Sequence, residues 1–144
     1  MPIGIDIFSG AGGLSLGAEM AGFQVRFAVE KDKSAANTYR YNHPNTLVIE
    51  NDIHNINPQD YLLPNEHVSI VFGGPPCQGF SLSNTMTRNM KNPNNSLFEE
   101  FLRFVNEIQP DWFLFENVEG FAHFEKGKIQ HLVEQRFREM GYLR

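Results

Sequence analysis

Short apolar runs alternate with longer amphipathic segments along almost the whole chain. The apolar runs are rich in β-branched or aromatic residues and are bounded by Gly, Pro or polar residues, which predicts buried strands. They occupy residues 3–8, 23–29, 46–49, 68–72 and 112–115. Helices are predicted at residues 14–21, 33–41, 96–109 and 128–140. Strands that alternate with helices predict an α/β fold, in which a doubly wound, mostly parallel sheet is covered by helices on both faces.

Signals at the ends of the predicted helices agree with this division. Gly22 and Gly141 follow predicted helices at the position where glycine commonly ends a helix. Ser96, with Glu99 three residues later, has the pattern of a capping box, so we expect Ser96 to cap its helix. The pair Asn57-Pro58 predicts an N-cap followed by proline at the first position of a short helical turn.

Composition narrows the class of protein. A chain of 144 residues with 41% hydrophobic residues suits one folded domain with a core. The net charge of −5 opposes a broad phosphate-binding surface, so any surface for nucleic acid must be local or lie outside this chain. A single cysteine excludes an internal disulfide and suits a reducing cytosol. We expect neither a membrane span nor a signal peptide, because no long apolar run and no basic segment before an apolar one is present.

That single cysteine, Cys77, follows the predicted strand 68–72 and the Gly-Gly-Pro-Pro segment at 73–76. The glycines allow a tight turn with close backbone approach, and the prolines stiffen the chain around the cysteine. A free cysteine is often only a small buried hydrophobe. Here the preceding turn residues and the polar Gln78 and Ser81 after it favour a reactive thiol on a rigid loop. The carboxyl edge of a parallel sheet, where this loop is expected, is where ligands bind.

A glycine-rich turn after the first predicted strand is a candidate cofactor site. Gly10 and Gly12 fit the start of a dinucleotide fingerprint, but Ser15 stands where its third glycine is expected. This favours a cofactor without a pyrophosphate, such as a nucleoside that carries an amino acid. Glu30 ends the next strand, 20 residues after Gly10, and suits the ribose hydroxyls, while Asp52 could accept from an adenine amino group. The alternative is a plain tight turn with a solvated Glu30.

Glu116 ends the last predicted strand, 112–115. An acid at a strand end is often only a helix cap. In a doubly wound sheet, however, the fourth and fifth strands can be neighbours, which would place Glu116 across from Cys77. A thiol and an acid that face one pocket can attack a ring and protonate it in one step.

In order and spacing, these motifs resemble those of the cytosine-C5 DNA methyltransferases. Segment 6–14 resembles the cofactor loop of that family, segment 74–81 its nucleophile motif and segment 116–118 its catalytic acid motif. Segment 93–98 resembles a motif in which Asp-Pro-Arg-Asn precedes Leu-Phe, although Asn92 and Asn94 replace the Asp and the Arg, respectively. The resemblance covers nearly the whole chain. It implies a Rossmann-like methyltransferase fold.

The resemblance further implies that the cofactor is S-adenosyl-L-methionine, with S-adenosyl-L-homocysteine as product, and that no metal takes part. The scattered histidines agree with the absence of a metal site and are predicted to lie on the surface; they are His43, His54, His67, His123 and His131. Apolar walls for the adenine would come from Phe8 and Ile53. The residues implied to bind the cofactor are Phe8, Ser9, Gly10, Gly12, Gly13, Leu14, Glu30, Lys31, Asp52, Ile53, Gly74, Pro75 and Leu97.

The implied catalytic residues are Cys77, Glu116, Asn117 and Pro76. The target cytosine is flipped out of duplex DNA, the Cys77 thiolate adds to ring carbon 6, and Glu116 protonates ring nitrogen 3. Carbon 5 then takes the methyl group, and loss of its proton expels the thiol. Asn117 is implied to hold the nucleophile loop. Segment 82–95 resembles the mobile segment that closes over the flipped base, with a plain surface loop as the alternative.

The resemblance also predicts what this chain lacks. Residues 1–144 are expected to form the S-adenosylmethionine-binding catalytic subdomain, without the target-recognition region and the C-terminal motifs of the family. We therefore expect a sheet that is incomplete at its C-terminal side, with an exposed apolar edge, and little or no methylation by the chain alone. Truncation, a split enzyme with a C-terminal partner chain and a degenerate gene remain open.

Several functions remain open at this point. The leading hypothesis is a cytoplasmic DNA methyltransferase of a bacterial or phage-like restriction–modification system, with double-stranded DNA as partner in the complete enzyme and no membrane association. The alternatives are a tRNA cytosine-C5 methyltransferase, a non-catalytic cofactor-binding half of a split enzyme, and a nucleotide-dependent oxidoreductase. The oxidoreductase is disfavoured by Ser15 and by the residues around Cys77.

Overall fold

A single parallel sheet organises the protein. The computed structural model describes residues 1–75, 95–116 and 128–142. Its five strands run in the order β3-β2-β1-β4-β5, and all neighbouring pairs are parallel. The strands are β1 (Ile3–Ile7), β2 (Gln24–Glu30), β3 (Leu47–Glu50), β4 (Ile70–Gly73) and β5 (Trp112–Phe115). The helices are α1 (Gly13–Met20), α2 (Lys33–Asn42), α3 (Asn95–Ile108) and α4 (Lys128–Glu139), with short 3₁₀ turns η1 (Ile53–Asn55) and η2 (Pro58–Tyr61). The predicted doubly wound α/β fold is confirmed.

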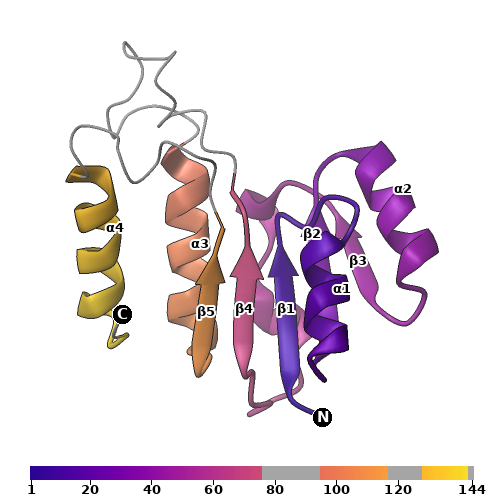
Figure 1. Ribbon diagram of the computed structural model, residues 1–144, viewed down its shortest axis with the longest axis horizontal. Coiled ribbons are helices and arrows are strands. Elements are labelled where there is room, and N and C mark those ends of the chain that lie inside the picture. The colour runs from indigo at the N-terminus through magenta and orange to yellow at the C-terminus, as the bar shows by residue number, and fades with distance from the viewer. Residues whose placement is uncertain (76–94, 117–127, 143–144) are drawn as a thin grey trace.

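The strand order reverses between β1 and its neighbour β4, which follows β3 in the chain. Ligands of open α/β sheets bind at such a reversal, outside the carboxyl ends of the strands. The turn after β1 and the segment after β4 therefore emerge side by side at one edge, the upper edge in Figure 1. The fold alone thus places the predicted cofactor turn next to the start of the predicted nucleophile loop.

The two faces of the sheet are packed differently. Alternate residues of β1, namely Ile3, Ile5 and Ile7, point into the larger core, which α3 and α4 cover. Aromatic rings dominate this side, and Phe113 of β5 stacks on Phe137 of α4 with ring centroids 3.8 Å apart. The opposite face carries a small cluster under α2 that consists of Ala28, Ala36, Tyr39 and Val48. Helices on both faces agree with the predicted layers (Figure 1).

Most predicted boundaries hold within a residue or two, because local signals set them. Gly22 and Gly141 have φ values of 98° and 97° and follow the helices they end. In each case the next amide donates to a carbonyl five residues back, at 3.0 Å for Phe23 and 3.1 Å for Tyr142, which completes a Schellman motif. Asn57 accepts from the Gln59 amide at 3.1 Å, as expected of an N-cap.

The predicted capping box at Ser96 depends on a side chain that lies outside the described residues. Helix α3 begins at Asn95, so Ser96 lies within its first turn. The Glu99 carboxylate, which would have reached back toward the cap, instead accepts two hydrogen bonds from Arg136 at 2.8 and 2.9 Å. This bidentate pair joins α3 to α4. The Glu99 carboxylate is therefore held by a residue distant in the chain.

Strand β5 is the outer strand of the sheet among the described residues. Phe113 and Phe115 face the aromatic core, so Trp112 and Leu114 face the other side. No described element covers these two side chains, which are 71% and 48% exposed. In the part of the chain that the structure describes, the sheet therefore ends in the exposed apolar edge that was expected.

Candidate cofactor and catalytic site

The turn after β1 folds sharply back over the end of the strand. Phe8, Gly10 and Gly12 have φ values of 66°, 56° and 103°, all in the left-handed region. For a bulky residue such as Phe8 this conformation is strained, and strain of this kind concentrates at functional sites. The Ser9 amide donates to the Val29 carbonyl at 3.0 Å, which ties the turn to the end of β2. The turn is thus held in one shape by the sheet itself.

A buried hydrogen-bond chain lies beneath this turn. The Ser15 hydroxyl donates to Asp6 Oδ2 at 2.6 Å and lies 2.6 Å from the Tyr39 hydroxyl. Because Ser15 has a single hydroxyl proton, Tyr39 must donate to Ser15. Burial raises the pKa of Tyr39 to about 12. Ser15, where the dinucleotide fingerprint expects glycine, therefore links β1, α1 and α2 through side chains.

Asp6 is fully buried, and its Oδ1 atom has no hydrogen-bond partner in the described part of the chain. Burial raises the pKa of Asp6 from 3.8 to about 7, and the nearby Glu30 carboxylate adds to the effect, while the Ser15 hydrogen bond opposes it. The sequence motifs predicted no separate role for Asp6. A charged residue within an otherwise apolar strand was the signal that could have identified it.

His43, predicted to lie on the surface, is buried, with its side chain 3% exposed. Its Nε2 atom lies 3.1 Å from the Gly12 carbonyl oxygen, and its Nδ1 atom lies 3.0 Å from Glu19 Oε1. A Cβ atom at Gly12 would lie 2.5 Å from His43 Nε2. The imidazole therefore supports the turn from below and requires glycine above it. Tyr39 and His43 lie four residues apart on one helix face, a spacing that could have paired them in advance.

Glu30 has the position predicted for a ribose contact. Its Oε1 atom accepts from the Gly10 amide at 2.7 Å and its Oε2 atom accepts from the Asp32 amide at 2.8 Å. Each carboxylate oxygen can accept a second hydrogen bond. The carboxylate therefore joins the glycine turn to the end of β2 and retains the capacity to accept from a diol.

Asp52 follows β3 and caps η1. Its Oδ1 atom accepts from the His54 amide at 3.0 Å and from His54 Nδ1 at 2.6 Å, and Lys31 Nζ lies 3.6 Å from Oδ2. These hydrogen bonds, the backbone one first, lower the pKa of Asp52. Ile53 is buried in the main core, whereas Phe8 is half-buried against it. The contact of these side chains with adenine stays a prediction.

The ends of β4 and β5 bring the predicted catalytic acid to the start of the nucleophile loop. The Glu116 amide donates to the Gly73 carbonyl at 3.0 Å. A Cβ atom at Gly74 would collide with Glu116 Oε2, so the carboxylate lies directly against Gly74. Pro75 is buried, and Glu116 is exposed. The predicted catalytic residues Pro76, Cys77 and Asn117 lie outside the described residues.

The other predicted cofactor residues line the same edge or its surroundings. Ser9 is buried in the turn, and Gly13 and Leu14 open α1, which has no side-chain cap. Leu97 lies in the first turn of α3 and packs half-buried against the core. Backbone amides at such an uncapped helix start can receive an anionic group.

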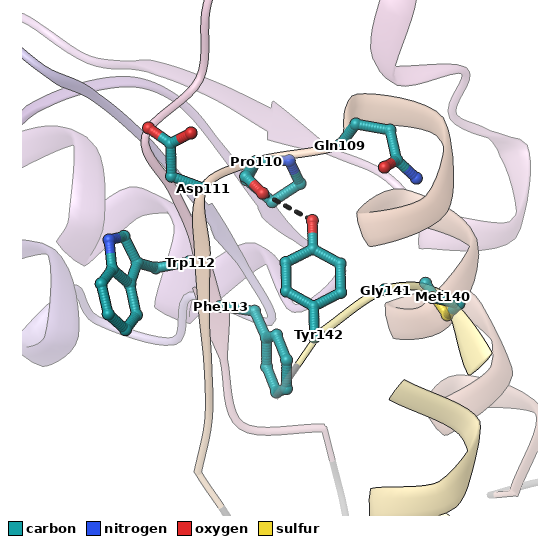
Figure 2. Close-up of a pocket in the computed structure, with 8 residues that line it drawn as sticks. All are labelled: Gln109, Pro110, Asp111, Trp112, Phe113, Met140, Gly141 and Tyr142. Atoms are coloured by element: carbon teal, nitrogen blue, oxygen red, sulfur yellow. Dashed lines mark hydrogen bonds between the residues drawn. The ribbon is translucent and has the colours of Figure 1, made fainter. Parts of the chain in front are cut away.

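A hollow of about 690 Å³ lies elsewhere, at the amino end of β5. It is lined by Gln109, Pro110, Asp111, Trp112, Phe113, Met140, Gly141 and Tyr142. In Figure 2 the Tyr142 hydroxyl donates to the Pro110 carbonyl at 2.5 Å, and Trp112 points away from Phe113. This hollow is at the edge opposite the glycine turn and holds none of the predicted site residues. We therefore assign the site to the carboxyl edge instead.

Within the ranges 1–75, 95–116 and 128–142, no group of three or more His, Cys, Asp or Glu side chains could hold a metal ion. No helix in these ranges is both long enough and apolar enough to cross a membrane.

The sheet reversal, the glycine turn and the acid at the end of β2 define a Rossmann-like domain of the kind that binds a nucleoside cofactor. The family model for C-5 cytosine-specific DNA methylases matches residues 3–143. The chain therefore belongs to the C-5 cytosine-specific DNA methylase family.

Similar proteins support this assignment. The type II methyltransferase M.DdeI of Desulfomicrobium norvegicum is 43% identical over 141 residues, which are 96% of this chain and 34% of the relative. M.AquIA of Picosynechococcus is 45% identical over 133 residues, 90% of this chain and 53% of the relative. The solved structure of a putative DNA modification methyltransferase from an E. coli prophage has a TM-score of 0.80 and 37% identity, and covers 96% of this chain and 38% of its own. The chain thus spans about a third to a half of these relatives.

A more distant structure, S. pombe Dnmt2 methyltransferase, has a TM-score of 0.69 at 20% identity. At this identity the likeness concerns the fold alone.

Proposed function

We propose that this chain is the cofactor-binding and catalytic part of a type II DNA cytosine-C5 methyltransferase that uses S-adenosylmethionine. The observation that carries the proposal is the position of the Glu116 carboxylate against Gly74, beside the glycine turn. A proton donor, the start of the thiol-bearing loop and a nucleoside site then share one sheet edge. Ring methylation through a covalent intermediate requires these three parts together.

The described residues fit the cofactor. The uncapped start of α1 suits its carboxylate, Glu30 can accept from the ribose, and ionised Asp52 can accept from the adenine amino group. Asp6 Oδ1, buried and without a partner among the described residues, retains the capacity to accept a hydrogen bond beneath the turn. When bound, S-adenosylmethionine supplies an electrophilic methyl group on a sulfonium.

The chain's own residues carry the remaining chemistry. In the proposed reaction the Cys77 thiolate forms a bond to carbon 6 of a flipped-out cytosine, and Glu116 gives a proton to nitrogen 3, which offsets the charge pushed into the ring. Carbon 5 is then nucleophilic and is methylated. Transfer of the carbon-5 proton to water restores the double bond between carbons 5 and 6 and expels the Cys77 thiolate, and nitrogen 3 returns its proton to Glu116. A thiol with an ordinary pKa of about 8.5 is mostly protonated at neutral pH, so the site must favour the thiolate.

We also propose that sequence recognition and the remaining catalytic motifs come from a further part of the protein or from a partner chain. The relatives extend far beyond the matched segment. The negative net charge and the exposed Trp112 and Leu114 agree with a domain that needs further polypeptide to bind DNA and to cover the edge of β5. By itself the chain should bind cofactor but methylate poorly.

Duplex DNA that contains 5-fluorocytosine tests this function. Fluorine cannot leave carbon 5 as a cation, so the covalent adduct persists after methyl transfer. The chain, joined to the remaining length of the E. coli prophage relative, should form a denaturant-resistant protein–DNA adduct in the presence of S-adenosylmethionine, and Cys77→Ala should form none. An adduct with substituted tRNA instead of DNA would identify a tRNA enzyme. Cofactor binding without any adduct would support a non-catalytic module.

A further inference from the structure

His54 lies between two carboxylates at the edge of the proposed adenine site. On one side, its amide and its Nδ1 atom both donate to Asp52 Oδ1, at 3.0 and 2.6 Å. On the other side, its Nε2 atom lies 4.0 Å from Glu100 Oε1 on α3. From the sequence, His54 was predicted to be one of several surface histidines without a role. The structure instead connects it to the residue predicted to read the purine.

Helix α3 holds this arrangement from below. Arg103 pairs with the Glu100 carboxylate and donates from Nη2 to the Ile53 carbonyl at 3.0 Å. The turn η1 that carries His54 is therefore held at its backbone, and the imidazole lies between two carboxylates. The backbone amide and the imidazole of His54 both donate to Oδ1, and the imidazole makes the shorter contact, so the His54 side chain helps to orient the Asp52 carboxylate.

The two hydrogen bonds from His54 go to Oδ1, and Asp52 Oδ2 faces Lys31 instead. Lys31 Nζ is 3.6 Å from Oδ2, and the Asp52 side chain is 32% exposed. A carboxylate held in this way is ionised and can only accept hydrogen bonds. A purine with a 6-amino group offers it a donor, whereas a 6-oxo purine offers an acceptor. Two acceptors that face each other are left unpaired, which disfavours binding.

We propose that His54 is a positioning residue that fixes the Asp52 carboxylate and thereby makes the site select 6-aminopurine over 6-oxopurine nucleosides. This inference rests on the proposed function, because Asp52 must face the purine. His54 itself does not touch the ligand. It acts by holding the Asp52 carboxylate where it can accept a hydrogen bond from the 6-amino group of the purine.

Calorimetry on the 144-residue chain with S-adenosylhomocysteine and its 6-oxo analogue S-inosylhomocysteine tests the proposal. One hydrogen-bonding contact of this kind discriminates by about tenfold or more, so the wild-type chain should prefer the adenosyl ligand by at least that factor. His54→Ala should reduce the preference to about threefold or less. His54→Asn, whose amide can still donate to Asp52, should restore most of it. His67→Ala, at an exposed histidine paired with Asp111, is the matched control and should leave the preference for the adenosyl ligand unchanged.

A purely structural role for His54 would weaken both ligands equally, and an unchanged ratio in His54→Ala would overturn the proposal. Asp52→Asn provides a second, independent check, because an amide can donate to the 6-oxo group and should shift the preference toward S-inosylhomocysteine. An Asp52→Asn ratio equal to that of wild type would show that Asp52 does not face the purine. If the wild-type chain binds neither ligand, the proposed function itself fails, which is a different outcome from binding with an unchanged ratio.

Discussion

The two halves of the sheet differ in how their functional edge is held. At the β1–β2–β3 half, the polar groups at the strand ends are tied to one another: Glu30 to the Gly10 amide, and Ser15 to Asp6 and Tyr39. At the β4–β5 half, Glu116 is exposed, and Leu114, two residues before it on β5, is 48% exposed as well. The first half is stabilised by its own hydrogen bonds. The second is shaped by close backbone approach and aromatic packing.

This difference predicts that the proposed cofactor binding and the proposed catalysis can be separated by substitution. A turn that is already folded loses little further conformational freedom when a ligand binds, which favours affinity. An exposed acid gains catalytic strength only when water is excluded around it. We therefore expect the nucleoside site to work within the described structure, whereas the catalytic edge depends on additional segments. Substitutions can therefore act on one half at a time.

The largest effect is expected at the contact between β1 and β4. A Cβ atom at Gly73 would collide with the Ile7 carbonyl oxygen, so Gly73→Ala must separate the two central strands. We expect a loss of more than about 4 kcal/mol in the free energy of unfolding, measured by urea denaturation, or no folded protein at all. Gly17→Ala is the control, because that site has open space on α1 and alanine should stabilise the helix by about 0.5–1 kcal/mol. Wild-type stability of Gly73→Ala would contradict the close packing of these strands.

The next largest effect is expected for Glu116→Gln, which should change methyl transfer without changing cofactor affinity. In an active methyltransferase that contains this chain, Glu116→Gln should slow methyl transfer by roughly 10²- to 10⁴-fold, the usual contribution of a general acid. Cofactor affinity, measured by calorimetry, should stay within about twofold of wild type, because the glycine turn is held independently of β5. Wild-type turnover in this variant would remove Glu116 from the mechanism. A large loss of affinity would show that the two halves are coupled.

The pH dependence of stability tests the buried hydrogen-bond chain of Asp6, Ser15 and Tyr39 beneath the glycine turn. The pKa of Asp6 is raised from 3.8 to about 7, so the folded protein binds the Asp6 proton more tightly than the unfolded chain does. The stability that this group contributes is fully present below about pH 4 and is lost as the pH rises through about 7.

Asp6→Asn removes this titration while it keeps the side-chain shape. Its free energy of unfolding relative to wild type should rise between pH 4 and pH 8 by up to a few kcal/mol, at roughly 1.4 kcal/mol per pKa unit. The difference between the variant and wild type removes the contributions of the other carboxylates to the pH dependence of stability. One of these is Asp52, whose lowered pKa makes stability fall as the pH falls. A difference that does not change with pH would show that Asp6 is not titrating in the fold.

The smallest effect is expected for Glu30→Ala. The substitution removes the predicted ribose acceptor and one anchor of the Gly10 amide, so affinity for S-adenosylhomocysteine should fall by about tenfold to a hundredfold. Glu50→Ala is a matched control, because Glu50 pairs with β2 Glu30 in register but its side chain contacts Arg40 on the exposed surface. Unchanged affinity in Glu30→Ala would mean that the ribose contact is wrongly placed.

The sequence predicted much of this architecture, because its signals are local. Periodicity located every strand and helix that the structure describes, and Gly22 and Gly141 ended their helices as expected. The order of motifs around Glu30 and Glu116 indicated the family that the comparisons confirm. Glu99 shows the limit of such signals, because no local pattern predicted its bidentate pair with Arg136, which is distant in the chain.

By itself, the sequence determined the class of fold and which residue types stand at the strand ends, since both depend on neighbours along the chain. Only the tertiary structure decided how those residues meet. The burial of His43 under Gly12, the hydrogen-bond chain from Asp6 through Ser15 to Tyr39 and the approach of Glu116 to Gly74 each join segments that are distant in the sequence. Such contacts depend on how strands pair and helices pack across the sheet, and periodicity within one segment carries no information about them.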